Sequence, residues 1–132
     1  MRIVLCLGLC VLTLSAPGVA ADDTATWRCR NADFEIGCQA GECRAADAHT
    51  AMNVRVGPTD VSVCAYSGCW AGAPSASARS GGFLTVTAAS LPFSTTPDDR
   101  ADVAVIIDTG SGAAAILVAS RFATPATCAP DM

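Results

Sequence analysis

The chain has 132 residues, of which 52% are apolar, and its twelve carboxylates outnumber its eight arginines to give a formal net charge of −4. This length suits one domain with a modest core and is too short for two. Nucleic acid is not an expected partner, because its binding depends on clustered cations that replace counterions, whereas a basic protein suits the charge. Lysine is absent, and this usage together with abundant alanine indicates a GC-rich bacterial genome.

The first 21 residues have the pattern of a secretory signal peptide. Arg2 precedes an apolar run from Ile3 to Leu14, and a small-residue exit follows at residues 18–21. We therefore expect a mature chain of residues 22–132, which forms a single β domain and is periplasmic or secreted. No later stretch reaches the about 20 apolar residues that a transmembrane helix needs, so no membrane anchor is expected after cleavage.

Alternation of apolar and polar residues dominates the mature region and predicts short β-strands. The strongest signal is a hairpin in which Met52–Val56 and Val61–Tyr66 flank the turn residues 57–60. A second antiparallel pair is predicted between Val103–Ile107 and Ala114–Ala119. Further strands are predicted at Thr26–Arg30, Phe34–Ile36, Glu42–Ala45 and Leu84–Ala88.

The segments between these strands are rich in small and turn-forming residues. Gly72–Gly82 and Ser94–Asp102 are expected to be loops, and a short helical turn is compatible with Ala45–Thr50. No window shows a sustained helical period. Together the pattern predicts an all-β fold, a small antiparallel meander that is closed into a barrel or folded into a sandwich and stapled by disulfides.

Six cysteines remain in the expected mature chain, and an even number in an exported protein indicates a disulfide framework. Of the 15 possible connectivities, we favour the one in which each C-x4-C unit closes the base of a hairpin. The expected pairs are Cys38 with Cys43, Cys64 with Cys69, and Cys29 with Cys128. The alternative, a zinc site built from both C-x4-C units, is disfavoured by their spacing and by export. No cofactor is predicted.

Tyr66 and Trp70 lie in and beside the second C-x4-C unit. A turn braced by a disulfide would present both rings as a rigid contact surface for a protein partner, and Arg79 in the following loop could assist. The alternative is that both aromatic rings pack over the disulfide as part of the core.

Three other patterns are less specific. Asp108-Thr109-Gly110 is the string found at aspartic protease active sites, but it occurs once and near the end, which favours a hairpin turn. His49, the single histidine, has no recognisable catalytic partner and is expected at the surface. Asp98, Asp99 and Asp102 could contribute oxygen ligands to calcium, but they lack the EF-hand spacing and favour a solvated loop.

Trp27-x-Cys29, Phe34-Glu35-Ile36-x-Cys38 and the segment from Cys64 to Trp70 resemble small exported proteins of Gram-negative bacteria that have no assigned activity. In its plan the chain is also similar to the periplasmic C-type lysozyme inhibitors, which are secreted antiparallel β-barrels that block a basic enzyme. That similarity rests on the aromatic-x-Cys start and on Ser75–Gly81, whereas the two C-x4-C units are foreign to the inhibitors.

These observations predict an exported envelope protein of unknown activity that binds or inhibits a protein partner. A structural or accessory envelope protein fits the same features without a ligand pocket. An enzyme fits least, because no acid–base pair, nucleophile or metal cluster stands out in the sequence.

Overall fold

The computed structural model describes residues 24–131, so the signal peptide predicted for residues 1–21 lies outside the described part. These residues form an eleven-stranded antiparallel sheet and contain no helix. The strands are β1 (Trp27–Asn31), β2 (Ile36–Gln39), β3 (Glu42–Ala45), β4 (Met52–Val56), β5 (Val61–Ala65), β6 (Gly68–Gly72), β7 (Ala76–Ser80), β8 (Phe83–Phe93), β9 (Thr96–Asp108), β10 (Ala113–Val118) and β11 (Phe122–Pro130).

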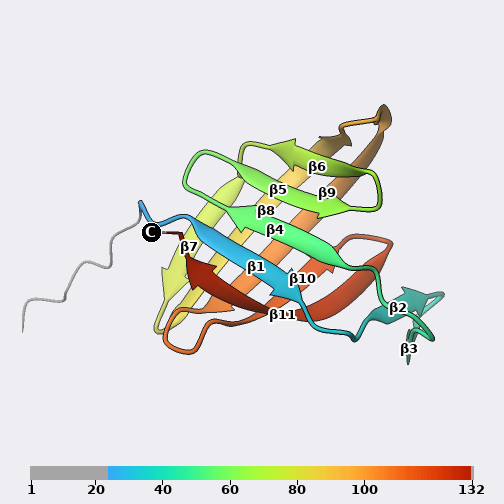
Figure 1. The fold of residues 1–132 in the computed structure, drawn as a ribbon, viewed down its shortest axis with the longest axis horizontal. Coiled ribbons are helices and arrows are strands. Elements are labelled where there is room, and N and C mark those ends of the chain that lie inside the picture. The colour runs from blue at the N-terminus through green and yellow to red at the C-terminus, as the bar shows by residue number, and fades with distance from the viewer. Residues whose placement is uncertain (1–23, 132) are drawn as a thin grey trace, which may run out of the picture.

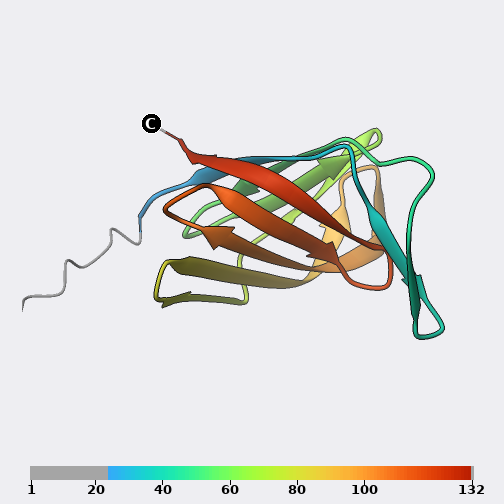
Figure 2. The same cartoon turned by 90° about the horizontal axis from the view of Figure 1, so that it is seen from below.

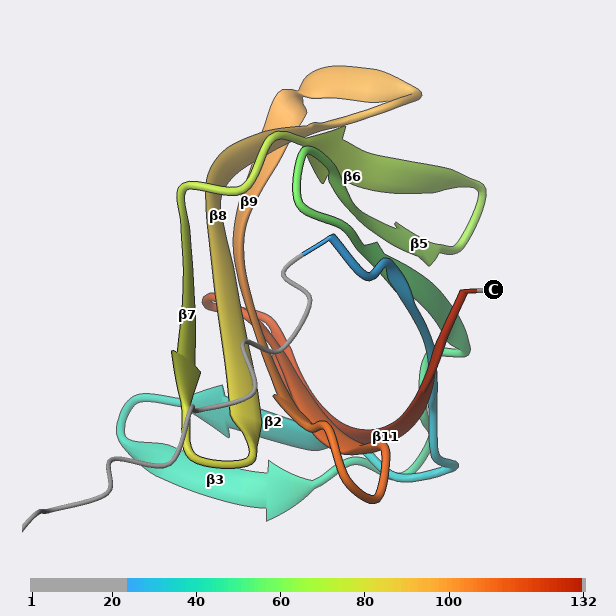
Figure 3. The same cartoon turned by 90° about the vertical axis from the view of Figure 1, so that its left-hand side faces the viewer.

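Eight of the strands close into a barrel, in the order β1-β4-β5-β6-β8-β9-β10-β11 (Figures 1 and 3). The ring closes because β1 pairs with β11, which places Cys29 opposite Cys128. The all-β prediction is therefore confirmed. Of the two predicted forms, barrel and sandwich, the protein adopts the barrel. Both predicted hairpins are present, since Val54 faces Val63 and Val105 faces Ile116.

The core is the inside of the barrel, and strand alternation fills it. Every second residue of β4, β5, β9 and β10 points inward, so that Val63, Val105, Ile107 and Ile116 are completely shielded from solvent. The prediction that Val54, Val63, Val105 and Ile107 share one core is confirmed. The intervening residues face outward and are exposed or half-buried.

The ring has one narrow seam, between β6 and β8. These strands meet in register only at Trp70 and Phe93, whose rings lie 4.7 Å apart between centroids. The amide of Ser94 also donates to the carbonyl of Cys69 over 2.9 Å. Strand β7 occupies the part of the β8 edge that β6 does not reach. The seam is therefore joined by one residue pair, two packed aromatic rings and hydrogen bonds between Cys69 and Ser94.

The β2–β3 hairpin lies outside the barrel and projects from one end of it (Figure 2). A single residue pair, Ile36 with Ala123, joins it to β11. The hydroxyl of Thr124 donates to the carbonyl of Phe34 over 2.6 Å, and this bond fixes the base of the hairpin. The strand predicted at residues 34–36 begins at Ile36 instead. Phe34 lies before it, where its carbonyl accepts the bond from Thr124.

Two predicted loops are wrong. Residues 72–82 contain β7, and residues 94–102 lie largely in β9. Strand β7 has no buried apolar row, and its sequence of alanine, serine and arginine gave no clear alternation of apolar and polar residues. The outer part of β9 is exposed and rich in acidic residues, because it extends past the barrel rim in a hairpin with β8. The helical turn considered for residues 45–50 does not form.

The three predicted disulfides are present: Cys29–Cys128, Cys38–Cys43 and Cys64–Cys69. The first lies buried inside the barrel and ties the first strand to the last, whereas Cys38 and Cys43 are exposed. Three such bonds fit an oxidising, extracellular environment. Within residues 24–131, no helix is long and apolar enough to cross a membrane.

Candidate functional site

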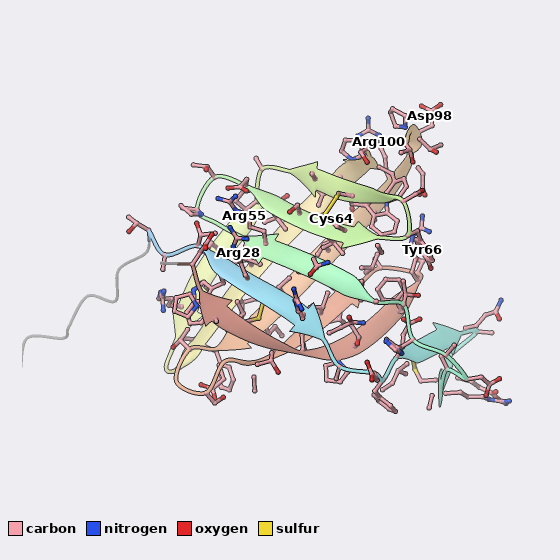
Figure 4. The ribbon with its side chains drawn as sticks, in the orientation of Figure 1. Arg28, Arg55, Cys64, Tyr66, Asp98 and Arg100 are labelled. Carbon is pink, nitrogen blue, oxygen red and sulfur yellow. A yellow bond between two sulfur atoms is a disulfide. The ribbon has the colours of Figure 1, made fainter. Side chains whose placement is uncertain are left out.

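Ionisable residues are distributed unevenly between the two ends of the barrel. One end carries the β5–β6 turn, the β8–β9 turn, the β10–β11 turn and the β2–β3 hairpin; we call it the acidic end (Figure 4). Among the described residues it gathers seven carboxylates and three arginines: Asp33, Glu35, Glu42, Asp47, Asp98, Asp99, Asp102, Arg44, Arg100 and Arg121. The remaining described residues carry four arginines and three aspartates, so the rest of the described chain lacks this excess of negative charge.

Tyr66 stands at the tip of the β5–β6 turn on the acidic end. Its side chain is 74% exposed, the highest value among the large apolar side chains described as exposed. Its φ is +56°, a left-handed conformation that costs a bulky L-residue on the order of 1–2 kcal/mol. The Cys64–Cys69 disulfide closes the hairpin immediately behind this turn. The result is an aromatic ring that is held in solvent by a rigid, strained turn.

A chain of contacts connects Tyr66 to the loop between β3 and β4. The phenol oxygen of Tyr66 lies 3.4 Å from the hydroxyl oxygen of Thr50. The amide of Thr50 donates to the carboxylate of Glu35 over 2.9 Å, and the carbonyl of Thr50 accepts from the side-chain amide of Asn31 over 2.6 Å. The phenol of Tyr66 is therefore linked through Thr50 to the carboxylate of Glu35.

Trp70 does not belong to this surface, and its prediction as a contact residue is wrong. Only 1% of Trp70 is exposed, because strand alternation turns it inward with Val63 and away from Cys69. Its ring packs against Phe93 and is covered by the guanidinium of Arg121, whose central carbon lies 5.0 Å from the ring centroid. Arg121 in turn pairs with Asp99.

Arg79 is also far from Tyr66, so the predicted joint surface does not form. Arg79 lies opposite Leu84 at the start of β8, whereas the hairpin that carries Tyr66 meets β8 at Phe93. Eight residues of β8 separate Leu84 from Phe93, and an irregularity interrupts the strand between Ala88 and Leu91, so these positions lie at most about 30 Å apart. Of the three predicted contact residues, only Tyr66 remains on the acidic end.

The acidic residues considered as calcium ligands point to different partners. Asp99 pairs with Arg121, and Asp102 accepts the amide of Ser90 over 2.6 Å. No group of three or more His, Cys, Asp or Glu side chains within residues 24–131 is placed to hold a metal ion. His49 lies at the surface, where its Nε2 is 3.1 Å from a carboxylate oxygen of Asp33.

The Asp108–Ser111 string forms the β9–β10 turn. The carboxylate of Asp108 accepts the amide of Gly110 over 2.9 Å and the hydroxyl of Ser111 over 2.7 Å. The Ser111 hydroxyl, followed by the Gly110 amide, holds the pKa of Asp108 below its usual value. Gly112 has a φ of +77°, and a Cβ there would lie 2.3 Å from the carbonyl oxygen of Cys128. The Asp108–Ser111 string therefore stabilises the β9–β10 turn.

The separation of charge between the two ends was missed by sequence reasoning, although a signal for it exists. The acidic residues occur mainly in two segments, 33–47 and 98–102. The up-and-down strand order brings the ends of these segments to the same rim of the barrel. Comparisons with protein-family models, curated proteins and solved structures find no match to this chain.

Proposed function

We propose that this protein is an exported binding module of the bacterial envelope, located in the periplasm or secreted, which engages a basic protein partner through its acidic end. The observation that carries the proposal is the exposed ring of Tyr66, held in a strained turn at the end of the barrel that gathers seven carboxylates. Rigid aromatic side chains lose little entropy on binding and are frequent among the residues that dominate interface energies.

Backbone strain supports a functional role for Tyr66. Glycine, asparagine or aspartate would adopt the positive φ of this turn at lower cost, and all three are frequent in hairpin turns. The β2–β3 turn shows this alternative at Gly41, whose φ is +82°, although Ala40 beside it also has a positive φ of +53°. Strain of this kind tends to occur at binding sites, where it holds a side chain ready for contact.

The charge distribution supports a basic partner. Seven carboxylates against three arginines produce a negative potential at the end that carries Tyr66, which steers a positively charged surface toward it. Salt screens such steering over a length of about 10 Å at 0.1 M, so the association rate should fall as salt is added. The similarity in plan to lysozyme inhibitors makes a C-type lysozyme the first basic partner to test.

The experiment measures binding of C-type lysozyme to the oxidised protein by isothermal titration calorimetry, with cytochrome c as an equally basic control. The key variant is Tyr66→Gly, which removes the ring and suits the positive φ. We expect it to weaken binding by about tenfold or more, as loss of an interface hot spot does. The matched control is Phe83→Ala, which removes an aromatic ring that is 53% exposed outside the acidic end.

Binding that is lost in Tyr66→Gly and kept in Phe83→Ala supports the proposal. Equal binding by both variants places the contact elsewhere and contradicts it. If lysozyme does not bind, the same variants are compared for capture of basic proteins from an envelope extract. Equal capture by wild type and Tyr66→Gly then contradicts the proposal and favours a structural or accessory role.

A further inference from the structure

Three arginines gather on the outer wall of the barrel, on strands β1 and β4. Arg28 and Arg30 point outward from β1, and Arg55 points outward from the neighbouring β4. Together with Asn53, Ser62 and Cys64 they line a hollow of about 310 Å³. Figure 4 shows Arg28 and Arg55 next to each other, at a distance from Tyr66 and Asp98. We call this surface the arginine wall.

The register of the sheet places like charges directly against each other. Arg28 is the cross-strand partner of Arg55, and Arg30 is the partner of Asn53. Directly opposed residues in an antiparallel pair have Cβ atoms about 4.5–5.5 Å apart, and like charges at this separation destabilise the sheet. Stability of the sheet alone therefore gives no reason for the opposed pair.

Carboxylates of the same chain offset this repulsion only in part. Asp131 contacts Nε of Arg28 at 2.8 Å, and Asp60 contacts Nε of Arg55 at 3.4 Å. Each of these contacts is made through Nε of the guanidinium group. Arg30 has no ion pair within residues 24–131. Three cations thus stand against two carboxylates in a chain whose net charge is −4.

We propose that the arginine wall binds the phosphate or sulfate group of an anionic ligand. Planar guanidinium groups donate paired hydrogen bonds to such oxyanions, and several cations are needed to balance a doubly charged group. The amide of Asn53 and the hydroxyl of Ser62 add neutral donors at the same hollow. Its volume lies at the lower end for ligand sites, so it suits a phosphate or a sugar phosphate. This proposal is independent of the protein-binding role.

The test is a titration of the ¹⁵N-labelled, fully oxidised protein with inorganic phosphate, with ionic strength held constant by sodium chloride. We expect saturable shifts of the amide signals of residues 28–30, 53–55 and 62, with a dissociation constant on the order of 1 mM. Acetate, which carries one charge, should bind about tenfold more weakly. Amide signals near Asp98, at the β8–β9 turn, should not move.

The deciding variant is the double substitution Arg28→Gln with Arg55→Gln, which we expect to weaken phosphate binding by about tenfold or more. Arg30→Gln is a second variant, and we expect it to weaken phosphate binding as well. The matched control is Arg44→Gln, which changes the charge of an exposed arginine on the β2–β3 hairpin that pairs with Glu42. The control should bind phosphate within about twofold of wild type. The spectra themselves report that each variant is folded.

Shifts that do not saturate, or that persist unchanged in both the double variant and Arg30→Gln, would overturn the proposal. Two further arms distinguish the source of the phosphate. Tighter binding of glucose 6-phosphate than of inorganic phosphate indicates a soluble sugar phosphate. Flotation with phosphatidic acid vesicles that is lost in the double variant indicates a lipid headgroup.

Discussion

Two hairpins of this protein have the same C-x4-C spacing and the same pairing of their cysteines, yet only one belongs to the barrel. Cys64 lies opposite Cys69 in β5–β6, and Cys38 lies opposite Cys43 in β2–β3. The β5–β6 hairpin forms part of the barrel wall, whereas β2–β3 is held by a single residue pair to β11. The disulfide therefore shapes a hairpin locally and does not decide where it packs.

The difference comes from the residues between and beside the cysteines. In β5–β6, Val61, Val63, Ala65 and Trp70 form an apolar row on the face opposite the disulfide, and this row is buried. In β2–β3, only Ile36 is a large apolar residue, and the remaining positions are exposed or half-buried. Burial of apolar area is the main favourable term in folding, so only the first hairpin gains from joining the core.

The largest expected effect is that of truncating the buried ring of β6. Trp70→Ala should lower the free energy of unfolding by about 3–5 kcal/mol, because it leaves a cavity and removes the contact with Phe93 at the barrel seam. Ile36→Ala in the outer hairpin should cost about 1 kcal/mol or less, since Ile36 is only half-buried. Chemical denaturation measures both. Equal losses would show that the outer hairpin is part of the cooperative unit.

Removing each hairpin disulfide sharpens the comparison. Replacing Cys64 and Cys69 by Ala should lower the free energy of barrel unfolding by about 2 kcal/mol on the chain-entropy model. The same change at Cys38 and Cys43 should leave barrel unfolding within about 0.5 kcal/mol of wild type. Amides of β2 and β3 should instead exchange hydrogen about 30-fold faster, which corresponds to the same loop entropy acting locally. Hydrogen exchange by mass spectrometry separates the two outcomes.

A matched pair of glycines tests packing without touching a disulfide. A Cβ on Gly68 would lie 2.8 Å from a ring carbon of Phe93, whereas a Cβ on Gly37 would meet no atom within 4 Å. Gly68→Ala should therefore destabilise the protein by about 1.5 kcal/mol through overpacking at the seam. Gly37→Ala should be neutral or slightly stabilising, because it restricts the unfolded chain. Thermal unfolding curves that coincide for the two variants would contradict this account of the seam.

The smallest expected effect concerns the β9–β10 turn, which is held without a disulfide. The pKa of Asp108 is lowered in the folded protein, so its ionised form stabilises the fold above the ordinary carboxyl pKa of about 3.9. This contribution is lost as the pH falls through the lowered value. The free energies of unfolding of wild type and Asp108→Asn should therefore differ at pH 7, and the difference should shrink as the pH falls below the ordinary carboxyl pKa. Ser111→Ala should reduce the difference, because it removes the leading cause of the shift.

The sequence by itself was sufficient for the local features of this protein. Alternation predicted the β4–β5 and β9–β10 pairs and placed Val54, Val63, Val105 and Ile107 in one core. Because each C-x4-C unit can close the base of a short hairpin, the spacing predicted two disulfides. The third followed because two cysteines remained. These predictions succeeded because period-two burial and hairpin return depend on neighbours in the chain.

The tertiary structure decided what depends on distant segments. It turned Trp70 inward against Phe93, paired Arg79 with the opposite end of β8 from the hairpin that carries Tyr66, and made strands of segments that lack an apolar row. It also brought Arg28 opposite Arg55 and collected the carboxylates on one rim. Each of these follows from ring closure and strand order. Such pairings join residues far apart in sequence, and local propensity contains no information about which distant strand edges meet.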